Sequence, residues 1–159
     1  MRTLYLTIIF VALMALAIPL HHSLAVSASS PLYTHFVYMF GHAGFIHWAV
    51  NSWCLVMLHH HFRAIRIVLA WMASVILSFI YYPSLPVLGA SVLISFFMGI
   101  TAPWLYTYKR LAFLQMLFIL AIGCFIPHIA GVYHLVLFTL GILYTKIEGI
   151  ISSIISLKD

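Results

Sequence analysis

The stretch SLPVLGASVLISFFMGI, from Ser84 to Ile100, begins with residues that disfavour a helix and ends in an apolar run that favours one. Proline fixes its own backbone and lacks an N–H, so helix is excluded up to about Pro86. Gly89-Ala90-Ser91 then leads into an apolar run, and we expect a helix whose first turn contains Ser91. The unpaired N–H groups and the dipole of such a turn favour negative charge. The stretch therefore predicts a serine hydroxyl beside a position suited to an anion.

The rest of the chain is equally apolar. Of 159 residues, 65% are hydrophobic and 6% are charged, and the mean hydropathy is +1.18. These values exceed those of a soluble domain of this length. The composition predicts an all-α, polytopic membrane protein.

Six segments are long and apolar enough to be membrane spans, because a spanning helix needs about 20 mostly apolar residues. We place them near 4–20, 44–60, 64–82, 89–106, 111–126 and 129–150. The connections after the first span are short, which predicts one transmembrane domain over residues 1–159, a six-transmembrane-helix bundle. The uncharged segment 21–40 is expected to be a loop resting in the membrane interface.

The cations predict the orientation, because Lys and Arg in short loops stay on the cytoplasmic side. All seven fall at the same side of the expected spans, so both termini should be cytoplasmic, as in a multi-pass plasma-membrane protein. The net charge of +5 indicates topology and contact with anionic membrane lipids rather than nucleic acid. Arg2, an apolar run and AVSASS also fit a cleaved secretory signal, which would leave five spans.

Acidic residues are almost absent, which excludes several catalytic classes. The two carboxylates, Glu148 and Asp159, both belong to the expected cytoplasmic end. Paired-aspartate proteases and H-E-x-x-H zinc proteases are therefore excluded. The consecutive histidines 59–61 lie beside Arg63 with no carboxylate nearby, so we interpret them as an interfacial helix end and expect no metal or cofactor. Histidines 21, 22 and 35 are likewise expected to be interfacial.

Polar side chains from three expected spans converge at the outer membrane level. His47 and Asn51 are four residues apart, which places them on one helix face, and His42 lies just before that span. His134 lies in the first two turns of 129–150, at a depth comparable to Ser91. Polar groups at membrane depth are expensive and indicate function.

Small residues predict that two of these spans touch. They recur every four residues in two stripes, which are Ser91, Ser95 and Gly99, and Gly141, Thr145 and Gly149. Such stripes allow helix backbones to approach closely in lipid. His134 precedes Gly141 by seven residues, nearly two turns, and so shares its face. Contact between the stripes would bring Ser91 and His134 within reach of each other.

A serine hydroxyl becomes a useful nucleophile when a histidine accepts its proton. The tetrahedral intermediate of acyl transfer then needs hydrogen-bond donors, each worth about 3 to 4 kcal/mol. His47, Asn51 and the Ser91 backbone N–H are the candidates. A Ser91–His134 dyad with these donors is the chemistry that the residues predict.

The order of these motifs resembles the rhomboid family of intramembrane serine proteases. The matching elements are H-x-x-x-x-H-x-x-x-N at His42, His47 and Asn51, then Gly89-x-Ser91, then His134, over essentially the whole chain. The resemblance implies cleavage of transmembrane protein substrates near their outer end. It implies that Ser91 is the nucleophile, His134 the general base and then acid, His47 and Asn51 the oxyanion donors, and His42 and Gly89 structural residues beside the site.

Three alternatives stay open at this point. Val92 stands where the family commonly has glycine, and Ser95 stands where an aromatic residue often packs on the catalytic histidine. These two differences favour a catalytically inactive rhomboid-like protein that binds membrane helices. If Val92 only crowds the nucleophile turn, glycine there should raise activity. His128, three residues before Gly131, competes with His134 as the base.

Overall fold

The computed structural model describes residues 2–81, 86–125 and 130–156. Within these ranges every regular element is a helix, and the one β-type contact is an isolated bridge between Val26 and Val87. The all-α prediction is confirmed for this part of the chain.

The longer helices occupy the six expected segments. They are α1 (Arg2–Ala17), α4 (Phe45–Met57), α5 (Ala64–Ile80), α6 (Ser91–Tyr108), α7 (Arg110–Phe125) and α8 (Gly131–Ser156). By length and composition, three stretches could cross a membrane, namely Arg2–Leu20, Ser91–Tyr108 and Gly131–Ser156. The other three helices are apolar but shorter, so the described chain has three candidate spans by this measure.

Several boundaries differ from the expected ones for local reasons. The first helix gives way to a 3-10 turn, η1 (Ile18–Leu20), at Pro19, which cannot donate a helical hydrogen bond. The segment 44–60 was expected to be one helix, but α4 stops at Met57 and η3 (His59–His61) follows. There the His59 ring donates from Nδ1 to the Val56 carbonyl at 2.8 Å, which satisfies a carbonyl at the helix end.

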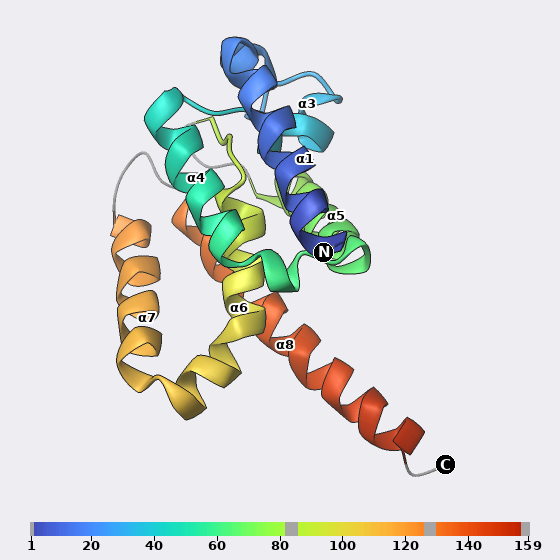
Figure 1. The fold of residues 1–159 in the computed structure, drawn as a ribbon. Coiled ribbons are helices and arrows are strands. Elements are labelled where there is room, and N and C mark those ends of the chain that lie inside the picture. Colours follow the sequence, from blue (N-terminus) through green and yellow to red (C-terminus); the bar gives the residue numbers. More distant parts are fainter. Residues whose placement is uncertain (1, 82–85, 126–129, 157–159) are drawn as a thin grey trace.

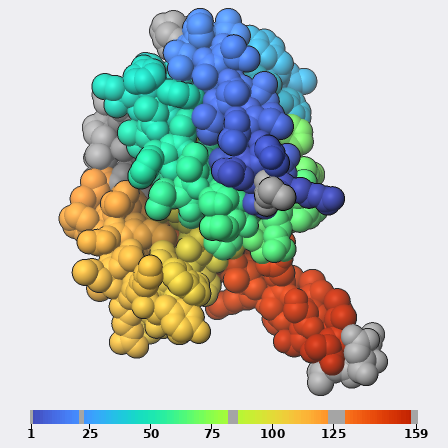
Figure 2. All heavy atoms as spheres, in the orientation of Figure 1, coloured from blue at the N-terminus to red at the C-terminus, as the bar shows by residue number. Residues whose placement is uncertain are grey.

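The last helix runs further than predicted. α8 continues past Ile150 to Ser156, and Figures 1 and 2 show this final part projecting away from the other helices. Ser152 and Ser153 donate to the carbonyls four residues earlier, at 2.9 and 3.0 Å, so these serines do not interrupt the helix. Gly149 alone does not end it, because a single glycine costs a helix only about 1 kcal/mol.

The segment expected to be an interfacial loop contains short helices. These are α2 (His21–Leu24), α3 (Thr34–Val37) and η2 (Tyr38–Phe40). The segment lies beside α1 and α5 at one end of the molecule (Figure 1). It returns toward α6 through the Val26–Val87 bridge, where each backbone N–H donates to the other residue's carbonyl at 2.9 Å.

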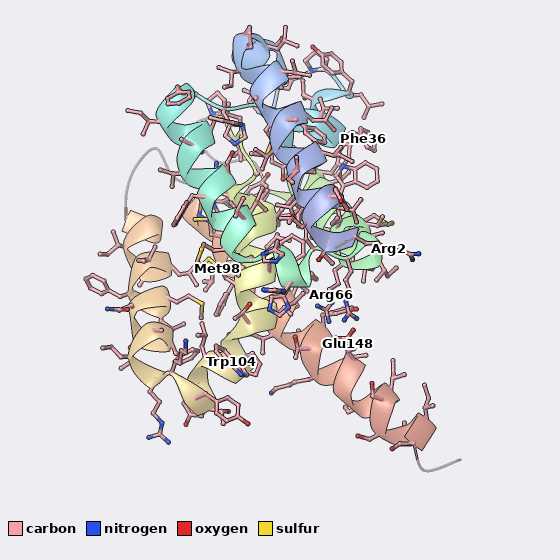
Figure 3. All side chains as sticks on the ribbon, viewed as in Figure 1. Arg2, Phe36, Arg66, Met98, Trp104 and Glu148 are labelled. Atoms are coloured by element: carbon pink, nitrogen blue, oxygen red, sulfur yellow. The ribbon has the colours of Figure 1, made fainter. Side chains whose placement is uncertain are left out.

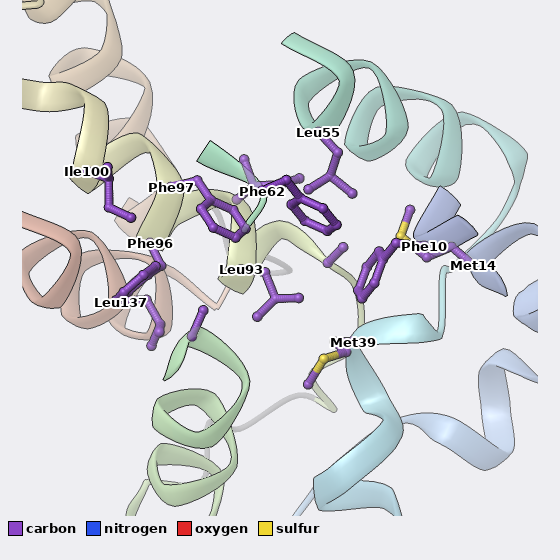
Figure 4. Packing of buried hydrophobic residues seen from close by; sticks show 13 residues of the cluster. Phe10, Met14, Met39, Leu55, Phe62, Leu93, Phe96, Phe97, Ile100 and Leu137 are labelled. Atoms are coloured by element: carbon purple, nitrogen blue, oxygen red, sulfur yellow. The ribbon is translucent and has the colours of Figure 1, made fainter. Parts of the chain in front are cut away.

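Helix α6 is the centre of the fold. It packs most extensively against α8 and also contacts α4, α5, α7 and η2. Figure 4 shows its buried face, which supplies Leu93, Phe96, Phe97 and Ile100 to a cluster with side chains of α1, α4 and α8. Because α6 touches nearly every other long helix, residues at its first turn are surrounded on several sides.

Candidate functional site

Ser91 is the first residue of α6, which agrees with its expected place in the first turn of a helix. The turn that leads into it uses Gly89 at φ +113°, a left-handed conformation that side chains with a Cβ rarely adopt. Ala90, at the N-cap position, makes no side-chain cap bond. The hydroxyl of Ser91 therefore lies at a helix N-terminus whose first N–H groups are not capped by the preceding side chain.

Ser91 and His134 contact each other directly. The Ser91 Oγ lies 2.9 Å from the His134 Nε2, and both residues are half-buried. His134 is the fourth residue of α8. A serine can donate to this nitrogen only if Nε2 is unprotonated, in which case the ring proton is on Nδ1. The geometry suits transfer of the serine proton to the imidazole.

Two glycines explain why α6 and α8 come so close. A Cβ on Gly99 would collide with the backbone carbonyl of Phe138, and a Cβ on Gly141 would collide with that of Phe96. Thr145 adds a hydrogen bond across the interface, donating to the Ile100 carbonyl at 3.3 Å. The predicted contact between small-residue stripes is present at Gly99, Gly141 and Thr145.

The stripes do not touch along their whole length. Nothing lies within 4 Å of a Cβ built on Gly149, so the contact ends before this residue. At the other end, Ser95 donates to the Ser91 carbonyl at 2.9 Å and is almost fully buried. Because its hydroxyl bonds within its own helix, Ser95 supports the first turn of α6 and leaves the His134 nitrogen to Ser91.

His47 and Asn51 lie beside the Gly89 turn that precedes Ser91. A Cβ on Gly89 would lie 2.8 Å from the His47 Cε1 and 3.5 Å from the Asn51 Nδ2. Both side chains come from α4, at positions four residues apart, as the sequence predicts. A larger residue in place of Gly89 would push these side chains away from Ser91.

The hydrogen bonds of His47 and Asn51 leave donors available. The Ala43 N–H donates to the His47 Nδ1 at 3.3 Å, so that nitrogen is unprotonated and Nε2 carries the proton. The Asn51 Nδ2 is buried and has no hydrogen-bond partner in the structure. A buried donor without a partner costs about 1 to 3 kcal/mol, which a bound oxygen atom would recover.

His42 lies directly behind His47. Its side chain is fully buried, its Nδ1–H donates to the Phe40 carbonyl at 3.0 Å, and its ring centre lies 4.9 Å from that of His47. Burial lowers the pKa of His42 to about 4, so the ring is neutral at ordinary pH. A neutral ring can pack against His47 without charge repulsion.

Other histidines differ in their surroundings. His35 of the outer segment is buried within the protein, and its Nδ1 lies 2.9 Å from the Ser78 Oγ on α5. The residues 59–61 form η3, and the described part of the chain contains no group of three His, Cys, Asp or Glu side chains that could hold a metal ion. The competing base, His128, lies outside the described residues.

Val92, which directly follows Ser91, packs into the core of the structure. It is fully buried in a cluster with Val26, Val87, Tyr38 and Tyr133. No sequence pattern pointed to Tyr38 or Tyr133, because neither belongs to a recognisable motif. Among the described residues they are the largest fully buried side chains.

Comparison of the chain with protein-family models, with curated proteins and with solved structures finds no match.

Proposed function

We propose that this protein is an intramembrane serine endopeptidase of the rhomboid type, a hydrolase that cuts transmembrane protein substrates near their outer boundary. The observation that carries the proposal is the 2.9 Å contact between the Ser91 Oγ and the His134 Nε2 at the N-terminus of α6. A serine and a histidine so placed can act as nucleophile and general base without a carboxylate.

The proposed reaction has two steps. His134 takes the Ser91 proton as Oγ attacks the substrate carbonyl carbon, and the same proton passes to the leaving amine when the peptide bond breaks. Water then attacks the acyl-enzyme, gives a proton to His134, and releases the new carboxyl end as the proton returns to Ser91. No metal or cofactor enters either step.

The donors around Ser91 suit the oxyanion of this reaction. The Asn51 amide is a buried donor without a partner, and the His47 Nε2 carries a proton. With the first N–H groups of α6 they would surround one oxygen atom bound beside Ser91. Because none of these groups is anionic, developing negative charge is the charge they favour.

The membrane arrangement is part of the proposal. We infer six spans from α1, α4, α5, α6, α7 and α8, although three of these are shorter than an average bilayer requires. The connection from α6 to α7 carries Lys109 and Arg110 and lies at the opposite end of α6 from Ser91 (Figure 1). The positive-inside rule supports cytoplasmic termini and an outward-facing site, and we place the protein in the plasma membrane.

Labelling with a fluorophosphonate tests the proposal. The purified protein should react at Ser91 and cleave a membrane-anchored reporter helix. Ser91→Ala and His134→Ala should each abolish cleavage, and the double variant should be no worse than either, because such groups act as a unit. Ser95→Ala is the matched control and should keep labelling.

A wild-type protein that is folded, fails to label and cleaves no helix would refute the protease function. Binding of reporter helices by that same protein would then favour the helix-binding alternative. Labelling at Ser91 that persists in His134→Ala at the wild-type rate would show that His134 is not the base.

A further inference from the structure

Tyr38 lies where the outer segment meets both halves of the candidate dyad. Its side chain is fully buried, and its backbone carbonyl accepts the Gly89 N–H at 3.0 Å, two residues before Ser91. Its ring belongs to the cluster that contains Val92 and Tyr133. One residue of η2 therefore contacts the turn that carries the nucleophile and the start of α8.

The ring contacts reach the chain neighbours of both reactive residues. Val92 follows Ser91, and Tyr133 precedes His134. The Tyr38 and Tyr133 rings pack edge to face, with centres 6.4 Å apart and planes at 84°. This is a favoured aromatic geometry, and it fixes the relative position of two rings more narrowly than aliphatic contact does.

The hydroxyl groups of both tyrosines are anchored at α5, one to a residue within the helix and the other to Tyr81, which directly follows its last residue. The Tyr38 hydroxyl donates to the Ser74 carbonyl at 3.2 Å, and the Tyr133 hydroxyl donates to the Tyr81 carbonyl at 2.8 Å. Burial raises the pKa of the Tyr38 phenol, which keeps it protonated and able to donate. Each ring is thus held at its polar end as well as by packing.

The segment that carries Tyr38 is itself attached to α5. The Trp71 Nε1–H donates to the Phe36 carbonyl at 2.9 Å, and the His35 ring meets Ser78 at 2.9 Å. Trp71, Ser74 and Ser78 follow one another at helical spacing along α5, so their contacts lie on one face. Helix α5 is a common support for the outer segment and for Tyr133.

The dyad needs such a support because the close α6–α8 contact lies well below it. The closest approach spans Phe138 to Gly141, four to seven residues after His134, which corresponds to about 6 to 10 Å along the helix axis. A rocking motion of α8 about that contact by about 10° would move His134 by roughly 1 to 2 Å, which is enough to lengthen or break the hydrogen bond to Ser91. A second contact near the outer end would prevent this motion.

We propose that Tyr38 is a positioning residue that sets the spacing between Ser91 and His134 by fixing the Gly89 turn and the start of α8 at one point. It touches neither reacting atom. Its effect on turnover rests on the proposed protease function, whereas its effect on the spacing does not.

Crosslinking tests the spacing without any catalysis. Ser91→Cys and His134→Cys are combined in a Cys54→Ser, Cys124→Ser background and treated with a short bifunctional thiosulfonate. Adding Tyr38→Leu should slow crosslinking several-fold, because α8 gains freedom to rock. Tyr33→Leu is the matched control, since Tyr33 is half-exposed in the same segment and its hydroxyl reaches only the Ser23 carbonyl at 3.0 Å. Equal crosslinking rates in all three proteins would overturn the proposal.

Kinetics on the single-site variants test the consequence for catalysis. Measured below the unfolding temperature, Tyr38→Leu should lower kcat by about 10²-fold with KM unchanged, as a misplacement of about 1 Å does. Tyr38→Phe keeps the aromatic ring that packs on Tyr133 and should recover most of the rate. A purely structural role would instead lower the thermal midpoint and leave kcat of the folded protein unchanged, which would overturn the proposal. If the wild-type protein has no activity, the protease function fails and the crosslinking rates alone decide the role of Tyr38.

Discussion

Arg66 and Glu148 form an ion pair that joins the start of α5 to α8, with 2.6 Å between Nη2 and Oε2 (Figure 3). The Tyr144 hydroxyl also donates to Glu148 at 3.2 Å, and the Tyr144 ring lies 5.6 Å from the Arg66 guanidinium carbon. The Arg66 side chain is 9% exposed, so the Glu148 carboxylate is the counterion that compensates its positive charge. No other acidic side chain occurs in the part of the chain that the structure describes.

Glu148→Gln should destabilise the protein because it leaves the Arg66 charge buried without a counterion. A hydrogen bond to a charged group is worth roughly 1.5 to 3 kcal/mol, and we expect a loss in that range. Thermal unfolding in detergent measures it. Lys146→Gln changes the charge by one unit on an exposed part of the same helix and should have little effect. Equal midpoints for the two variants would contradict the prediction.

Gly99→Ala should weaken the α6–α8 contact, because the new Cβ meets a backbone carbonyl that cannot move aside. Overpacking of this kind costs about 1 to 3 kcal/mol. Gly149→Ala is the matched control in open space, where the better helix propensity of alanine should raise stability by up to about 1 kcal/mol. Opposite shifts of the two thermal midpoints are the expected result, and a loss in Gly149→Ala would count against it.

Val92→Gly should lower stability by roughly 3 kcal/mol, since it combines a core cavity with poor helix propensity. Activity should not rise, because Val92 faces the cluster around Tyr38. Val132→Gly changes the equivalent second residue of α8, which is 43% exposed, and should cost only the propensity difference. Thermal unfolding and reporter cleavage provide the two measurements. Faster cleavage by Val92→Gly would instead show that valine crowds the turn at Ser91.

Asn51→Leu should separate stability from function. The buried Asn51 Nδ2 has no partner, so an apolar side chain of similar size should leave the unfolding free energy unchanged or raised. Loss of one oxyanion donor should nevertheless slow cleavage by about 10²- to 10³-fold. Fluorophosphonate labelling and kcat on the reporter measure the second effect. A stable variant with wild-type kcat would remove Asn51 from the proposed oxyanion site.

Stability should fall on mild acidification, partly through His42. Burial lowers the pKa of His42 from 6.5 to about 4, so the unfolded chain binds a proton more readily than the folded one between these values. The stabilisation from a neutral His42 is therefore complete above pH 6.5 and is lost as the pH falls toward 4. His42→Gln should reduce the drop in thermal midpoint between these pH values, whereas the exposed His60→Gln should not.

Local residue patterns determined the positions of the long helices and the contact between α6 and α8. Proline and glycine before an apolar run predicted that Ser91 lies in the first turn of a helix, and apolar segments predicted the six long helices. Small residues spaced by four predicted the contact at Gly99 and Gly141, and their spacing predicted that His47 and Asn51 share one face of α4. These features depend on near neighbours in the chain, so they can be inferred without knowledge of the packing.

Only the tertiary structure decided how the outer segment meets the site. His35 is buried against α5, Val92 fills a core cluster, and Tyr38 belongs to no sequence motif. Each of these depends on contacts between residues far apart in sequence, such as Tyr38 with Gly89 and Tyr133. A pattern within one helix cannot specify which side chain from another segment lies opposite, because that depends on how all the helices pack together.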